Sequence, residues 1–81
     1  MKIKLRFFSL LHHYFGTGEM ETNLDSPKTV QEVFFDLFED KELAEKLARS
    51  IRFAVNWEYV EPEMVVHEGD EVAFIPPVSG G

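Results

Sequence analysis

Hydrophobic and polar residues alternate at the beginning of the chain, from Lys2 to Phe8. Ile3, Leu5 and Phe7 fall on one face of this segment, and basic residues fall on the other. A period of two residues is typical of a strand that buries one of its faces. The pattern therefore predicts a first strand in this segment.

The alternation is lost after the first strand, which predicts a short helical turn and then a second strand. Ser9 is placed to cap a turn over residues 9–15 that would end near Gly16. Residues 17–25 predict a second, more polar strand. Because only a short segment separates the two strands, we expect them to pair antiparallel.

Helical spacing dominates the middle of the chain. Thr29 and Glu32 have the spacing of a capping box, which indicates the beginning of a helix. The hydrophobic residues that follow recur every three or four positions and comprise Val30, Val33, Phe34, Leu37 and Phe38. Such a stripe is typical of a helix that faces a core. Residues 40–50 predict a second helix, with Leu43 and Leu47 one turn apart.

Strand periodicity returns in the last part of the chain. Residues 51–56 and 59–60 predict two strands joined by a tight turn, since Asn56 tolerates a positive φ. Residues 67–70 predict another turn, and residues 71–75 predict a final strand. Four aromatic residues lie on the predicted inward faces and are expected in the core: Phe7, Phe34, Phe53 and Phe74.

The order of these elements predicts an α+β domain with one mixed sheet wrapped around a helix. A hairpin, a crossover helix and a returning last strand describe a ubiquitin-like β-grasp with one main helix and a second short helix. A ferredoxin-like split βαβ fold is compatible with the same periodicity, so the pattern leaves the topology open. We place the domain at residues 1–75 and an extended tail ending in Gly-Gly at residues 76–81.

Composition supports a folded domain and excludes several functions. Of the 81 residues, 44% are hydrophobic, well above the level of disordered chains. A net charge of -7 disfavours nucleic acid and anionic membranes as partners. The chain has no cysteine, which excludes disulfides, thiolate metal sites, a Cys-ligated electron carrier and a cysteine nucleophile.

The hydrophobic runs are short, and this bears on location. No run approaches the roughly 20 residues of a membrane span. The alternating first segment is also unlike the apolar block of a signal peptide. We therefore expect a cytoplasmic protein.

The pair His12-His13 is not expected to bind metal, because adjacent side chains diverge and no third ligand has a recognisable spacing.

Three hydrophobic residues are predicted to point away from the core. Strand alternation turns Ile75 and Tyr59 outward. Together with Phe8, they would place apolar groups on the open face of the sheet beside the tail, where a partner would cover them. The alternative is that these are scattered surface residues of the kind found on any protein.

The carboxyl-terminal residues resemble a known family. Gly69-Asp70-Glu71-Val72, followed at a fixed offset by Pro76-Pro77-Val78-Ser79-Gly80-Gly81, is similar to the end of the small subunit of molybdopterin synthase, the MoaD-type sulfur carrier. The resemblance extends upstream to Phe15-Gly16-Thr17 and Ala54-Val55-Asn56. The combination is more specific than a Gly-Gly end alone, which by itself is typical of many flexible termini.

This resemblance implies a function for the tail. The carboxylate of Gly81 would be adenylated with ATP by a MoeB-type enzyme, which resembles ubiquitin-activating enzymes. It would then become a thiocarboxylate and donate sulfur for the molybdopterin dithiolene inside the MoaE-type large subunit. The chain would not be an enzyme alone but part of a heterotetramer, with no permanently bound cofactor. The implied partner-binding residues are Gly80, Ser79, Val78, Pro77, Pro76, Ile75, Tyr59 and Phe8.

The residue types of the tail suit this chemistry. Gly80 and Gly81 lack Cβ atoms and can enter a narrow channel. Pro76 and Pro77 restrict the base of the tail and reduce the entropy lost on threading. At roughly 3.3 Å per residue the tail would reach about 20 Å beyond the domain. Two alternative functions remain open for this chain: a thiamine-pathway sulfur carrier and a ubiquitin-like modifier conjugated to a lysine.

Overall fold

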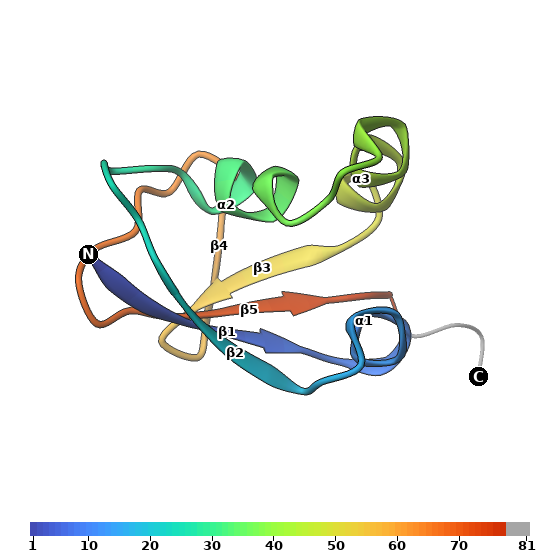
Figure 1. Ribbon diagram of the computed structural model, residues 1–81, viewed down its shortest axis with the longest axis horizontal. Helices are drawn as coiled ribbons and strands as arrows, with labels where there is room; N and C mark the ends of the chain where they lie inside the picture. Colours follow the sequence, from blue (N-terminus) through green and yellow to red (C-terminus); the bar gives the residue numbers. More distant parts are fainter. Residues whose placement is uncertain (78–81) are drawn as a thin grey trace.

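Figure 1 shows the computed structural model, which describes residues 1–77. The alternating first segment forms β1 (Lys2–Phe7), and its three predicted inward residues are buried. β2 (Glu19–Asn23) pairs antiparallel with β1, as predicted, and is shorter than the predicted segment. The first two strands therefore form the expected hairpin-like pair at one edge of the sheet.

The final strand lies in the middle of the sheet. The strand order is β2-β1-β5-β3-β4. β5 (Glu71–Ile75) pairs parallel with β1 and antiparallel with β3 (Arg52–Val55), which pairs with β4 (Glu58–Val60). This arrangement is the predicted β-grasp. It excludes the split βαβ alternative, in which the first strand leads through a crossover to a parallel strand.

The predicted capping box begins the helix that packs on the sheet. Thr29 caps α2 (Val30–Asp36): its hydroxyl accepts from the amide of Glu32, while the Glu32 carboxylate accepts from the amide of Thr29. Most of the predicted stripe is buried, namely Val30, Val33, Phe34 and Phe38. Leu37, which caps the end of the helix, is only partly buried.

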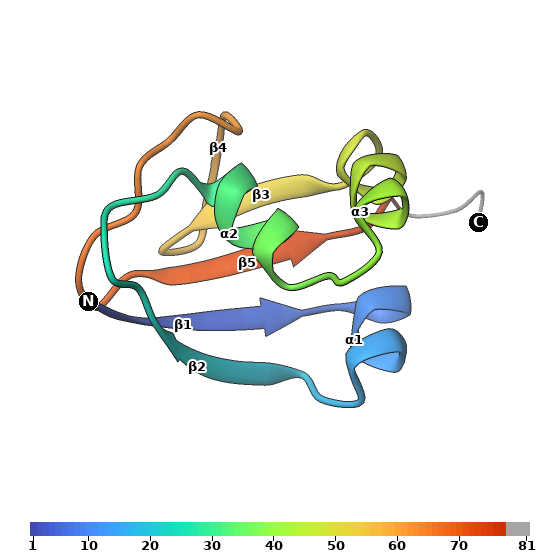
Figure 2. The same cartoon turned by 45° about the horizontal axis from the view of Figure 1, so that its top comes forward.

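α3 (Lys41–Ala48) follows after a short connection and is slightly longer than α2. The carboxylate of Asp40 caps it by accepting from the amide of Leu43 at 3.1 Å. Ala44 is fully buried, whereas the predicted pair Leu43 and Leu47 is partly buried against the core. Figure 2 shows that α2 and α3 lie over the same face of the sheet, which leaves the opposite face open.

The predicted helical turn is a third helix, α1 (Ser9–Phe15), and its predicted cap is wrong. The position that precedes the helix is Phe8, whose carbonyl accepts from the amide of Leu11 at 3.0 Å. Phe8 has no side-chain acceptor, and Ser9 already belongs to the first turn, so no side chain caps this end. The predicted end is confirmed: Gly16 adopts a φ of 75°.

Aromatic rings from the helix and the sheet meet in the core. The centroid of the Phe34 ring lies 4.9 Å from that of Phe38, 5.0 Å from that of Phe74 and 6.1 Å from that of Phe53. The Phe7 and Phe74 rings stack at 5.9 Å. All four aromatic residues predicted in the core are buried.

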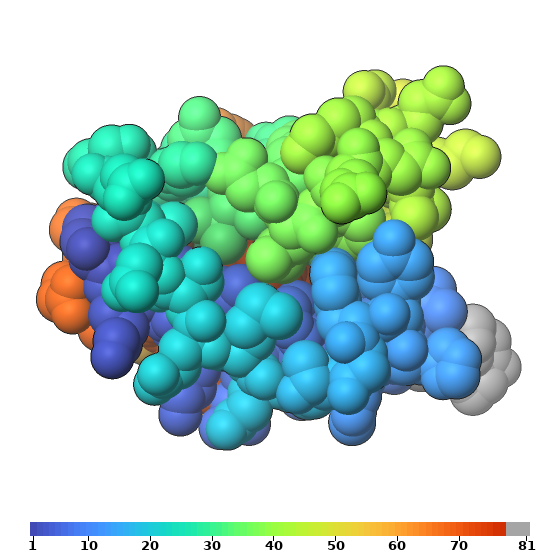
Figure 3. Space-filling view, viewed as in Figure 1, coloured from blue at the N-terminus to red at the C-terminus, as the bar shows by residue number. Residues whose placement is uncertain are grey.

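α1 closes one end of this core. The rings of Tyr14 and Phe15 lie 5.5 and 5.3 Å from that of Phe38, which follows α2. The space-filling view shows the light blue residues of α1 against the green residues of the helical layer (Figure 3).

Within the described part of the chain, no helix has the length and apolar character needed to cross a membrane.

Candidate partner-binding surface

The tail begins at the end of a strand that is held on both sides. β5 ends at Ile75, which lies opposite Arg52 of β3, while the preceding Phe74 lies opposite Phe7 of β1. Pro76 is half-buried and Pro77 is exposed, directly after the strand. The base of the tail is therefore positioned by a strand that pairs on both sides, in the middle of the sheet. The remaining predicted tail residues, Val78, Ser79, Gly80 and Gly81, lie outside the described residues.

The open face of the sheet carries an apolar groove next to this base. The groove has a volume of about 190 Å³. We call it the sheet-face groove, and its lining residues are Phe8, Ala54, Trp57, Tyr59, Ala73 and Ile75. All three residues predicted to point outward belong to it: Tyr59 and Phe8 are exposed and Ile75 is half-buried. The structure thus brings these three residues together, as the sequence predicts.

Two alanines form the floor of the groove. The strand register aligns Ala73 of β5 between Arg6 of β1 and Ala54 of β3, and Ala54 in turn lies opposite Tyr59 of β4. Both alanines face away from the core, yet they are only 6% and 4% exposed. Larger side chains around the two alanines shield them from solvent. Because an alanine side chain is short, these neighbours extend farther from the sheet and leave a depression between them. The groove is thus a product of cross-strand register.

Trp57 lines the groove and was missed as a site residue by sequence reasoning. Its side chain is 68% exposed, and its φ is 72°. A left-handed backbone costs a residue with a Cβ about 1–2 kcal/mol. The signal that could have found it lies in the turn, since two-residue hairpin loops with two positive φ angles favour Asn-Gly. Here Asn56, with a φ of 51°, is followed by tryptophan instead of glycine.

Asn56 ties the tip of the β3–β4 hairpin to the start of β5. Its side-chain oxygen accepts from the amide of Glu71, and its side-chain nitrogen donates to Asp70, both at 3.0 Å. Its backbone amide donates to the carbonyl of Glu71 at 2.8 Å. These bonds fix the position of the turn, and hence of Trp57, relative to the central strand.

Two arginines stack on the aromatic residues of the groove. The guanidinium of Arg6 lies 5.2 Å from the ring centroid of Trp57, and that of Arg52 lies 5.3 Å from that of Tyr59. Arg6 also forms ion pairs with Glu71 and with Glu19, the latter at 3.6 Å. Cation–π contacts at exposed sites contribute about 0.5–1 kcal/mol. They favour the observed positions of both aromatic rings on the surface.

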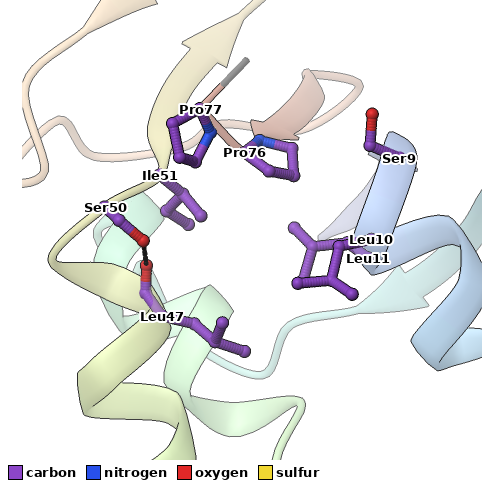
Figure 4. A pocket seen from close by; sticks show the side chains of 8 residues that line it. All are labelled: Ser9, Leu10, Leu11, Leu47, Ser50, Ile51, Pro76 and Pro77. Atoms are coloured by element: carbon purple, nitrogen blue, oxygen red, sulfur yellow. Dashed lines mark hydrogen bonds between the residues drawn. The ribbon is translucent and has the colours of Figure 1, made fainter. Parts of the chain in front are cut away.

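A second apolar pocket lies on the other side of the tail base, between α1 and α3 (Figure 4). It has a volume of about 620 Å³, and its apolar lining comes from Leu10, Leu11, Leu47, Ile51, Pro76 and Pro77. The hydroxyl of Ser50 at its rim donates to the carbonyl of Leu47 at 3.2 Å. Sequence reasoning missed this pocket, because it forms between two helices that are distant in the sequence.

The histidine pair lies near the end of α1, where both side chains are exposed. Over residues 1–77, no three histidine or carboxylate side chains gather in a way that would hold a metal ion. Away from the groove, Lys28 has a raised pKa, because its ammonium group pairs with the carboxylate of Asp36. The chemistry of the described surface is therefore that of apolar contact and charge pairing.

These features define the class of protein: a ubiquitin-like β-grasp domain whose central strand β5 ends beside an apolar groove and is followed by Pro76 and Pro77. The model of the ThiS family matches residues 5–81, and the chain belongs to this family. The match includes the terminal Gly80-Gly81.

Individual relatives agree with the resemblance found in the sequence. A molybdopterin synthase sulfur carrier subunit of Chlamydomonas reinhardtii is 30% identical and is covered over 100% of both chains. One of Pyrenophora tritici-repentis is 39% identical over 80% of this chain and 76% of its own. The solved structure of a putative molybdopterin converting factor, subunit 1, from Pyrococcus furiosus has a TM-score of 0.74 at 25% identity, with 96% and 99% of the two chains covered.

Proposed function

We propose that this chain is the sulfur carrier subunit of a molybdopterin synthase and that Gly81 carries the sulfur. The family match carries this proposal, because it extends through the domain to the terminal Gly-Gly. The names of the two relatives favour the molybdopterin branch over a thiamine-pathway carrier. A lysine-conjugated modifier would share the activation step but not the transfer of sulfur.

The proposed chemistry follows from the poor reactivity of a carboxylate. One oxygen of the Gly81 carboxylate attacks the α-phosphate of ATP, which forms an acyl adenylate and releases pyrophosphate. A sulfur donor then displaces AMP, which takes that oxygen with it, and leaves a thiocarboxylate. Its sulfur is a soft nucleophile that bonds to a carbon of the pterin precursor as a leaving group departs from that carbon. Water then cleaves the thioester that results, which leaves the sulfur on the pterin and restores the Gly81 carboxylate. No side chain of this chain, which has no cysteine, needs to take part. An adenylating enzyme of the MoeB type would supply the first step.

The domain would serve to present the tail. β5 holds the base of the tail, and the sheet-face groove lies directly beside it. A large subunit of the MoaE type would cover the groove while the tail enters its active site. At roughly 3.3 Å per residue, the fully extended tail would reach about 20 Å. On this proposal the chain is not an enzyme alone and holds no cofactor of its own.

Intact-mass analysis tests the proposal directly. The chain is incubated with ATP, the candidate adenylating enzyme and a sulfur source. We expect one oxygen to be replaced by sulfur, with the change mapped to the C-terminal peptide. Deletion of Gly81, or extension of the chain beyond it, should abolish the mass change while thermal unfolding stays the same. A mass change that persists in either variant would contradict the assignment to Gly81.

A further inference from the structure

Trp57, at the tip of the β3–β4 hairpin, has a strained backbone and is a candidate for a further binding residue. We propose that Trp57 contacts the subunit that accepts the tail and that its side chain is kept at the expense of backbone stability. This inference rests on the proposed function, because that function identifies the partner as the large synthase subunit. Trp57 would thus contact the large subunit in addition to the three groove residues that the sequence predicts as partner-binding: Phe8, Tyr59 and Ile75.

The first argument is the backbone. Both residues of the hairpin loop have positive φ values, 51° at Asn56 and 72° at Trp57. Asparagine tolerates this region, and glycine enters it freely, whereas a bulky residue there is an outlier. Strained residues of this kind cluster at functional sites. The domain gains little in return, since the Trp57 side chain is 68% exposed.

The second argument is that the ring is held ready for a partner. The Arg6 guanidinium stacks on it, and Arg6 is itself fixed by ion pairs with Glu71 and Glu19. The hydrogen bonds of Asn56 fix the turn that carries the ring. A side chain that is already ordered loses less entropy on binding. Tryptophan is also enriched among the residues that dominate binding free energy at interfaces.

The third argument identifies the occupant of the groove. Ala54 and Ala73 leave a small depression, and Trp57, Tyr59 and Ile75 stand around it. A depression with an apolar floor and apolar walls fits one aliphatic or aromatic side chain. Ile75 immediately precedes the tail, so a subunit that takes the tail is already beside the groove. We therefore assign the groove to an apolar side chain of the tail-accepting subunit.

Two substitutions separate the binding role from the strain. Trp57→Gly and Trp57→Ala both remove the ring, but only glycine relieves the left-handed backbone. We expect both variants to bind the large subunit about tenfold more weakly, equivalent to about 1.4 kcal/mol. Trp57→Gly should melt about 4–8 °C above Trp57→Ala. Titration calorimetry and thermal melts of the full chain measure the two effects.

Met64→Ala is the matched control, since Met64 is an exposed hydrophobic residue outside the groove. It should leave affinity unchanged. Wild-type affinity in both Trp57 variants would overturn the binding role, and equal melting temperatures would overturn the strain argument. Either result leaves the proposed function intact if the wild-type chain binds the large subunit and gains sulfur at Gly81. A wild-type chain that does neither would refute the proposed function itself.

Discussion

Phe34 of α2 connects the helical layer of the domain to its sheet through the aromatic core. Its side chain is completely buried, and its ring lies within 6.1 Å of the ring centroids of Phe38, Phe53 and Phe74. It therefore joins the helix to β3 and β5, two of the three inner strands of the sheet. Because β5 leads into the tail, loss of this contact would affect the element that positions the reactive end.

Phe34→Ala removes a large side chain from a closely packed site. Such a change costs about 3–5 kcal/mol, from the lost transfer free energy and the cavity that remains. Three aromatic neighbours place the expected value in the upper half of that range, since aromatic pairs contribute about 0.5–1.5 kcal/mol beyond area burial. At roughly 0.05–0.15 kcal/mol per residue, a domain of 81 residues has a total stability of about 4–12 kcal/mol. The substitution removes a large part of it.

Urea denaturation followed by circular dichroism measures this loss. With a slope near 1 kcal/mol per molar urea, the midpoint should fall by about 4–5 M while the slope stays the same. Phe35→Ala is the matched control, because Phe35 is adjacent but only partly buried against the core. We expect it to cost less than half as much. A loss below about 1.5 kcal/mol for Phe34→Ala, or a larger loss for Phe35→Ala, would refute the placement of the helix face.

Two further predictions concern the groove and the helix cap. Ile75→Ala and Tyr59→Ala should each weaken binding of the large subunit about tenfold with little change in melting temperature, because both side chains lie on the open face. Unchanged affinity in calorimetric titrations of both variants would leave the tail as the sole recognition element. Thr29→Ala should lower the free energy of unfolding by about 1 kcal/mol, since it removes the acceptor for the Glu32 amide. Denaturation of Thr29→Ser, which retains the hydroxyl, should show wild-type stability, and an equal loss in both variants would contradict the capping role.

Sequence periodicity predicted the elements that depend on local interactions. The capping box at Thr29 and the strand alternation before Phe8 involve residues a few positions apart, so their patterns are legible along the chain. The cap of α1 was the exception. Ser9 has the right residue type, but the hydrogen bond from Leu11 to Phe8 places Ser9 inside the helix. Residue type alone does not determine where a helix begins.

Some features of the candidate site are likewise determined by the sequence alone, and others only by the tertiary structure. The sequence alone determined the Gly-Gly tail and its resemblance to sulfur carriers, because these are properties of adjacent residues. Alternation alone also turned Tyr59 and Ile75 outward. Only the tertiary structure decided that these residues line one groove, because it aligns Ala54 with Ala73 across strands that are joined through the hairpin and a long loop. Only the tertiary structure placed Trp57 over that groove, since a ring at a hairpin tip acquires neighbours through the register of the whole sheet.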